Sequence, residues 1–144
     1  MSGKNRSERQ GRIMNEFEIT NGVLTRYTGN EKEVIIPEGV ISIGKNAFLE
    51  CSNLKEITIP NSVTSIEECA FWGCENLTKI TIPDSVTSIG ESAFEQCISL
   101  TSITVSNINT IIEDFAFWNC KNLKEISIPE GVKYIGKNTF NIEN

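Results

Sequence analysis

Hydrophobic and polar residues alternate along this chain in a pattern that repeats every 23 positions. Phenylalanine and cysteine mark the repeat most clearly, and leucine and isoleucine keep the same step. The ladder residues are Phe48, Phe71, Phe94, Phe117 and Phe140, together with Cys51, Cys74, Cys97 and Cys120. A fixed period of this length is typical of a solenoid, in which each repeat stacks only on its neighbours. We therefore expect these side chains to line one continuous core.

Each repeat opens with a short alternating segment, as at Ile57-Thr58-Ile59. Its isoleucines fall on one face and its threonine on the other, which predicts a half-buried strand. In most repeats a proline follows and ends the strand, because proline has no N–H for a ladder. A second short extended piece comes next, at Val63-Thr64-Ser65-Ile66 in this repeat. The chain then turns, and we expect a single helical turn to bring the ladder phenylalanine inward.

Two features of the repeats predict details of the backbone. Just before the next strand, the repeats carry Asn53, Asn76 and Asn122, and asparagine tolerates the left-handed backbone that we expect there. One repeat lacks both its proline and its inward valine, since Asn109 stands where Val86 stands one repeat earlier. We expect a local irregularity at this point: either Ile108 rotates inward or the coil bulges.

The segment before the first repeat predicts a β-hairpin. Two alternating runs, at 17–20 and 23–27, flank Asn21-Gly22, a pair that favours the positive φ angles of a tight hairpin turn. Such a hairpin would cover one end of the core, as solenoids require. We divide the chain into a disordered basic leader at 1–13, a hairpin cap at 14–33 and an array of 23-residue units at 34–144, with 14–144 as a single domain.

The repeat unit resembles the BspA-like class of leucine-rich repeats. The resemblance rests on Ala70-Phe71, Cys74, Leu77, Ile80, Ile82-Pro83, Val86 and Ile89-Gly90, and it extends over residues 14–140. It implies an α/β repeat solenoid, a right-handed superhelix of short strands and single helical turns with an N-terminal hairpin cap. It also implies adhesion or protein binding, the usual roles of such repeats in surface proteins of host-associated bacteria.

Charge is distributed unevenly along the chain. The net charge is −6, yet residues 1–12 contain four arginines or lysines and one glutamate, so the rest is strongly acidic. An acidic surface repels phosphate backbones, which argues against a nucleic-acid partner. No apolar run is long enough for membrane insertion, and the N-terminus lacks the apolar core of a signal peptide. The sequence as written therefore predicts a cytoplasmic protein, or a cell-surface or secreted one if it is a fragment of a longer protein.

The chain contains no histidine. This removes the usual general base, the nucleophilic triads built around it and the commonest transition-metal ligand. The ladder cysteines stand 23 residues apart, whereas structural zinc sites use close pairs, and a total of five cysteines does not suit a disulfide framework. We therefore expect a protein that is not an enzyme and has no catalytic residue, metal site or cofactor.

Two further features have both a structural and a functional interpretation. Cys69 stands outside the cysteine ladder, and a partly exposed thiol there could react or crosslink, but we favour a surface cysteine without special reactivity. One column stacks three carboxylates between two lysines: Lys45, Glu68, Glu91, Asp114 and Lys137. This column suits a cation site or a basic partner, but we favour acids placed at the starts of helical turns, where the local dipole stabilises them.

Outward positions supply the candidate binding residues. Trp72 and Trp118 share one column, two repeats apart, and an exposed tryptophan is a typical binding anchor. Packing of each indole over the neighbouring coil is the alternative. The outward strand positions predict a flat polar sheet, and repeat proteins usually bind partners on such an extended surface. Its candidate residues are Thr58, Thr81, Thr104, Lys79 and Glu125.

These observations predict a non-enzymatic scaffold for protein–protein interaction with leucine-rich-repeat architecture. The alternative is a fragment of a bacterial cell-surface adhesin that binds host or partner proteins. The four residues after Phe140 are too few for another strand, so the core would be open at its C-terminal end. Because open strand edges and apolar ends favour association, we expect contact between copies of the chain through that end.

Overall fold

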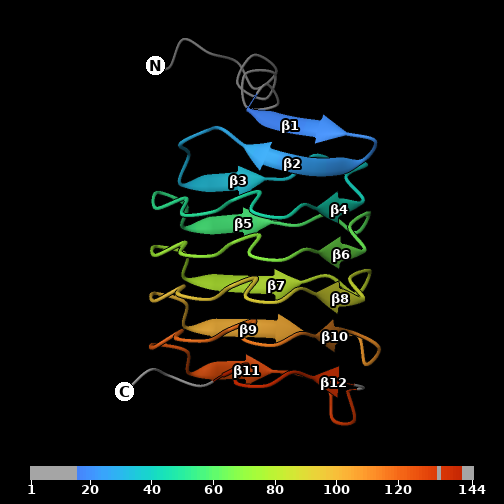
Figure 1. The fold of residues 1–144 in the computed structure, drawn as a ribbon, viewed down its shortest axis with the longest axis vertical. Helices are drawn as coiled ribbons and strands as arrows, with labels where there is room; N and C mark the ends of the chain where they lie inside the picture. Colours follow the sequence, from blue (N-terminus) through green and yellow to red (C-terminus); the bar gives the residue numbers. More distant parts are fainter. Residues whose placement is uncertain (1–15, 133, 141–144) are drawn as a thin grey trace, which may run out of the picture.

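Short strands wind around one axis in residues 16–132 and 134–140, the part of the chain that the computed structural model describes (Figure 1). An antiparallel hairpin comes first, formed by β1 (Phe17–Thr20) and β2 (Val23–Tyr27). One stack of strands contains β3 (Glu33–Ile35), β5 (Glu56–Thr58), β7 (Lys79–Ile82), β9 (Ser102–Val105) and β11 (Glu125–Ser127). The other contains β4 (Ser42–Ile43), β6 (Ser65–Ile66), β8 (Ser88–Ile89), β10 (Ile111–Ile112) and β12 (Tyr134–Ile135).

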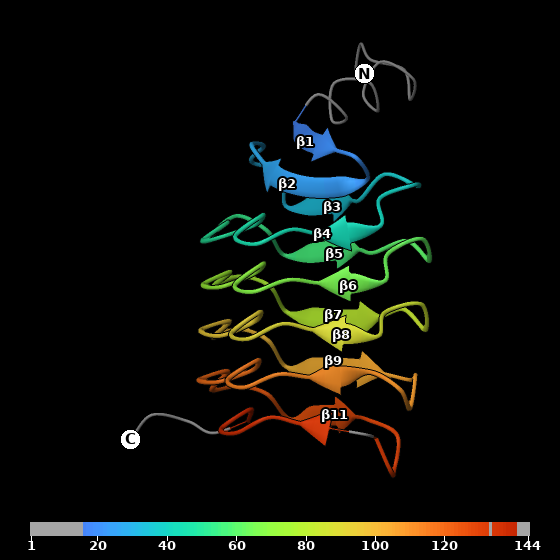
Figure 2. The ribbon, with the colours of Figure 1, turned by 45° about the vertical axis from the view of Figure 1, so that its right-hand side comes forward.

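Each coil has two strand sides and a turn segment, and successive coils repeat this outline (Figure 2). The even-numbered strands continue the hairpin as one seven-stranded sheet, whereas the odd-numbered strands form a two-stranded sheet, β3-β5, and a three-stranded sheet, β7-β9-β11. The paired strands of neighbouring coils are parallel and in register, as with Thr81 beside Thr104 and Ser65 beside Ser88. The 23-residue period of the sequence is therefore the length of one coil.

The predicted hairpin is present and begins the seven-stranded sheet. Its turn residues, Asn21 and Gly22, have φ angles of 51° and 81°, which is why this pair joins the two strands tightly. β2 then pairs with β4 in parallel, with Val23 beside Ser42. In this way an antiparallel element leads into a parallel array without leaving the first coil uncovered. The division of the chain at residues 13 and 33 stays a prediction, and the leader at 1–13 lies outside the described residues.

The ladder phenylalanines form a stack of nearly parallel rings along the solenoid axis. Adjacent ring centroids lie 4.9 Å apart for Phe48 and Phe71, 4.9 Å for Phe71 and Phe94, 5.1 Å for Phe94 and Phe117, and 5.6 Å for Phe117 and Phe140. These separations match the spacing of paired strands, about 4.8 Å, because each coil repeats the last. Tyr27 of the hairpin extends the stack, with its ring centroid 5.1 Å from that of Phe48.

The turn segments are not helical, so the predicted single helical turns and the α/β class are wrong. Within the described ranges every regular element is a strand, and the chain is a β-solenoid. In the first turn segment, Ala47 and Leu49 donate their N–H groups three residues back, to the carbonyls of Gly44 and Asn46. The alternate N–H groups donate to backbone carbonyls of the next coil. Asn46 donates to Glu68, Phe48 to Ala70 and Glu50 to Trp72. Donors committed to the next coil cannot form the i−4 bonds of an α-helix.

This hydrogen-bond pattern requires left-handed backbone at two columns of the turn segment. Positive φ angles occur at Asn46, Cys69, Ser92, Phe115 and Asn138, and again at Glu50, Gly73, Gln96 and Asn119. The predicted left-handed positions, Asn53, Asn76 and Asn122, are not among them, so that prediction is wrong. Their side chains instead bridge to the previous coil; the Asn122 amide, for example, donates to the Ile98 carbonyl at 2.7 Å. Asparagine serves there as a side-chain donor, not for its backbone tolerance.

The left-handed column gives a stability prediction at Cys69, whose φ is 56°. Replacing Cys69 by Asn should raise the free energy of unfolding by about 0.5–1 kcal/mol, since asparagine tolerates this conformation better. Replacing it by Val should lower that free energy by about 1–2 kcal/mol, because a β-branched side chain is least compatible with positive φ. Chemical denaturation of the three proteins measures both changes. Equal stability of the Asn and Val variants would contradict the backbone assignment.

The irregular coil places Thr110, not Asn109, at the inward position. Thr110 is fully buried, and its N–H bonds three residues back to the Asn107 carbonyl, as the inward valines of regular coils do. Its hydroxyl donates to the Val86 carbonyl oxygen at 2.8 Å, so burial leaves no unpaired polar atom there. Ile108 is 47% exposed, so inward rotation of Ile108 is wrong. One additional residue precedes the inward position and one fewer follows it, so the coil keeps its 23 residues and shows the predicted irregularity.

Candidate functional site

The odd-numbered strands present a flat polar surface, which we call the outer face. Its middle row consists of Thr58, Thr81, Thr104 and Ser127, all exposed, and it continues on β3 with Ile35, which is 70% exposed. The register aligns Thr81 with Thr104 and Thr104 with Ser127. A second row aligns Lys79 and Glu125 on either side of Ser102. Five of the seven candidate binding residues therefore lie together on one surface.

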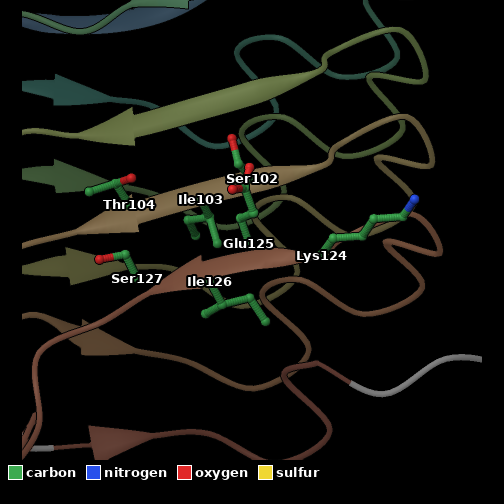
Figure 3. A pocket seen from close by; sticks show the side chains of 7 residues that line it. All are labelled: Ser102, Ile103, Thr104, Lys124, Glu125, Ile126 and Ser127. Carbon is green, nitrogen blue, oxygen red and sulfur yellow. The ribbon is translucent and has the colours of Figure 1, made fainter.

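A shallow hollow lies at the C-terminal end of the outer face, between β9 and β11 (Figure 3). Its lining is Ser102, Ile103, Thr104, Lys124, Glu125, Ile126 and Ser127. Figure 3 shows Glu125 beneath Ser102, and Lys124 extending away from the strands. Ile126 is 47% exposed although the equivalent Ile103 is 1% exposed. The difference arises because β11 has a neighbouring strand on one side only.

The two tryptophans lie on the turn segments and not on the outer face. Both are half-buried. Trp118 packs edge-on against Phe115 of its own coil, with ring centroids 6.1 Å apart and planes at 84°. Trp72 instead lines a shallow hollow with Glu50, Ser52, Gly73, Glu75 and Gln96. The shared column thus contains two different environments, and the role of either residue as a binding anchor stays a prediction.

The hollow beside Trp72 was missed by sequence reasoning. It combines residues from three successive coils, so no local motif announces it. A signal was nevertheless present in the column Glu50, Gly73, Gln96 and Asn119, where a glycine interrupts longer polar residues. At a backbone position shared by all coils, the residue without a side chain marks the coil that differs from its neighbours.

All five cysteines are free thiols. Three of them donate to ladder phenylalanine carbonyls of the previous coil: Cys74 to Phe48 at 3.1 Å, Cys97 to Phe71 at 3.2 Å and Cys120 to Phe94 at 3.2 Å. Burial raises the pKa of Cys51 to about 11 and that of Cys120 to about 12, and it also raises the pKa of Cys74 and Cys97. Burial, reinforced by Glu68, raises the pKa of Cys69 as well. Reactive cysteines typically have a depressed pKa, and the pKa of each of these thiols is shifted in the opposite direction.

The column of acids between two lysines is held by local contacts. Lys45 and Glu68 form an exposed ion pair at 3.5 Å, and Asp114 accepts a hydrogen bond from the Lys137 backbone N–H at 2.8 Å. No helical turn is present here, so the predicted interaction with a helix dipole is wrong. Among the described residues, no group of three or more potential ligands is arranged to hold a metal ion.

The described part of the chain also contains no helix of the length and apolarity needed to span a membrane.

Comparison with known protein families gives a match. The family model for the BspA type leucine-rich repeat region matches residues 18–144 in six copies. No curated protein sequence matches the chain.

Solved structures of leucine-rich repeat proteins are similar to this fold. That of T. pallidum is 22% identical with a TM-score of 0.60, and the similarity covers 88% of this chain and 86% of that one. That of Eubacterium ventriosum is 23% identical with a TM-score of 0.62, over 80% of this chain and 40% of that one. At these identities the likeness shows a shared repeat architecture.

Proposed function

Because this chain belongs to the BspA-type leucine-rich repeat family, we propose that it is a non-enzymatic scaffold for protein–protein interaction. The observation that carries the proposal is the outer face, where exposed polar side chains recur in register on successive strands. Repeat proteins of this kind bind partners on extended surfaces.

The charges of the outer face suit a polar protein partner. Lys79 lies between Glu56 and Ser102 in its row, and Glu125 follows, so both signs are available within a few strand spacings. The adjacent threonine row offers hydroxyl groups that donate and accept hydrogen bonds. A partner lying across the strands would meet a new hydroxyl about every 4.8 Å. This arrangement favours recognition of an extended segment or an exposed strand over that of a small molecule.

Site-specific photocrosslinking tests the proposal. A photoreactive side chain placed at Thr81 or at Thr104 should yield the same adducts, because the two positions are adjacent on the outer face. The matched control is Thr87, which is also exposed but lies next to β8 on the other strand stack. Adducts that form at Thr87 as readily as at Thr81, or none at either outer position, would contradict binding by the outer face.

A second candidate function is that of a segment of a bacterial cell-surface adhesin, which would place the repeats at the cell surface or outside the cell. It is favoured by the E. ventriosum leucine-rich repeat structure, of which this chain spans 40%, since an array of this size can form part of a longer protein. An export signal or a wall anchor in the flanking reading frame would support this second function over an intracellular scaffold.

We also propose that copies of the chain associate through the last coil. Its exposed apolar residues are Ile126 at 47%, Tyr134 at 45% and Ile135 at 42%. The strands that hold them, β11 and β12, are edge strands of their sheets. An apolar surface beside unpaired backbone groups favours pairing with another chain.

A further inference from the structure

We propose that the hollow beside Trp72 binds an arginine side chain of the protein partner. The inference rests on the scaffold function proposed above and adds a chemical identity to one contact. The hollow is lined by Glu50, Ser52, Trp72, Gly73, Glu75 and Gln96. It therefore joins one aromatic ring, two carboxylates and two neutral polar groups on a single surface.

Gly73 lines the hollow without a side chain of its own. Gly73 is buried, and a Cβ at this position would approach the Cγ of Glu50 to 3.2 Å. Its φ of +73° is matched by 54° at Glu50 and 65° at Gln96, so the backbone of this column is the same with and without glycine. The conformation does not demand glycine here, and glycine adds no side chain of its own to the hollow that Trp72 lines.

The charge of the hollow is uncompensated. Glu50 and Glu75 are both exposed, and neither takes part in an ion pair within the described ranges. The ion pair found in the described part of the chain joins Lys45 to Glu68, and neither residue lines the hollow. Two free carboxylates beside an indole attract a cation, since the ring face is itself electronegative.

Arginine fits this arrangement better than lysine does. Its guanidinium is flat, stacks on an indole face and donates several N–H groups in a fixed fork to carboxylates. A shallow hollow can take a flat group that keeps one face on the ring and its edge toward Glu50 and Glu75. The ammonium of lysine is more strongly hydrated and offers no planar face, so it gains less from the indole.

Trp118 provides an internal comparison. It occupies the same column as Trp72, but Phe115 packs edge-on against its ring. Asn119 takes the place of Gly73, and Lys121 takes the place of Glu75. The position equivalent to Gly73 thus carries a side chain, and the position equivalent to Glu75 carries a positive charge. Any cation binding that depends on the hollow should be detected at Trp72 and not at Trp118.

Fluorescence of single-tryptophan variants tests the proposal directly. The Trp118→Phe variant leaves Trp72 as its one indole, and the Trp72→Phe variant leaves Trp118. Each is titrated at low salt with the blocked peptide Gly-Gly-Arg-Gly-Gly, and separately with the same peptide containing citrulline, which has a similar shape and no charge. We expect a saturable change in Trp72 fluorescence with the arginine peptide alone, and no saturable change at Trp118.

Two further changes locate the binding in the hollow. In the Trp118→Phe background, Gly73→Gln should fill the gap with the residue found one coil later, and the saturable signal should disappear. The pair Glu50→Gln and Glu75→Gln should weaken binding by about fivefold or more, because charge-assisted hydrogen bonds become neutral ones. Circular dichroism verifies folding, and the glutamine pair remains informative if Gly73→Gln destabilises the chain, since both glutamates are exposed.

Saturation by citrulline, an equal response at Trp118, or the absence of saturation at Trp72 would overturn the inference. So would full binding by the Glu50→Gln and Glu75→Gln variant. These outcomes are separate from crosslinking at Thr81 and Thr104, which tests the outer face. Failure of the fluorescence test with successful crosslinking removes the arginine site alone, whereas failed crosslinking with a Trp72 response moves the binding surface to the turn segments.

Discussion

Replacing Phe94 by alanine is expected to lower the free energy of unfolding by about 3–5 kcal/mol. The Phe94 ring is fully buried and lies between two neighbours, with centroids 4.9 Å from Phe71 and 5.1 Å from Phe117. Its removal leaves a ring-sized cavity that the adjacent coils cannot close, because their strands are held in register. Chemical denaturation monitored by circular dichroism measures the loss.

Two matched variants test the explanation. Phe140 stacks on one neighbour only and is half-buried, so Phe140→Ala should cost less than half as much as Phe94→Ala. Glu91 is exposed in the same coil as Phe94, and Glu91→Ala should change the stability by less than about 0.5 kcal/mol. If all three variants lost equal stability, the ring stack would not be the continuous core of the fold.

The stacking of coils could be predicted from the sequence because it depends on side chains that recur at a fixed interval. Phe71 and Phe94 must occupy equivalent places if each coil repeats the last, and the ring stack follows from that alone. The hairpin was predictable for a similar reason, since Asn21-Gly22 fixes its own turn locally. Both are properties of residues that are close in sequence or related by the period.

The turn segments could not be predicted in the same way. Their form depends on hydrogen bonds between coils, such as that from Phe48 N–H to the Ala70 carbonyl at 2.7 Å. A local pattern that ends on an inward phenylalanine suits a helical turn equally well. The left-handed column also contains Cys69 and Phe115, which have no intrinsic preference for positive φ. Stacking imposes this conformation, and the asparagines at 53, 76 and 122 were misleading because their side chains, not their backbones, carry the interaction.

The same distinction between local pattern and contacts in three dimensions applies to the candidate sites. The outer threonines follow from the alternation of side chains along a strand, so Thr81 and Thr104 could be assigned to one surface from sequence. The difference between Trp72 and Trp118 could not, because it depends on what adjoins each ring in three dimensions. Phe115 packs at nearly right angles to one indole, and the other indole lines a hollow.

Association through the last coil is expected to bring this 144-residue chain together in solution as its concentration rises. The exposed side chains of Ile126 and Ile135 would be covered in the associated form, and burying an isoleucine contributes on the order of 1.5–3 kcal/mol. Replacing Ile126 by Lys and Ile135 by Glu should therefore weaken association by at least about tenfold. Because both isoleucines are exposed in the single chain, the two replacements should change its free energy of unfolding little. Sedimentation velocity over a concentration series measures the effect.

The matched control for this prediction is Ile35→Lys. Ile35 is 70% exposed on β3, near the opposite end of the solenoid, so it tests general apolar attraction without touching the last coil. We expect this variant to associate as the parent does. A parent chain that stays monomeric throughout the series, or an equal loss of association on Ile35→Lys, would show that the last coil is not the contact.

Because β11 and β12 lie at that end, a specific contact should also protect their backbone amides from hydrogen exchange as concentration increases. Protection confined to those two strands would identify edge pairing as the mode of association.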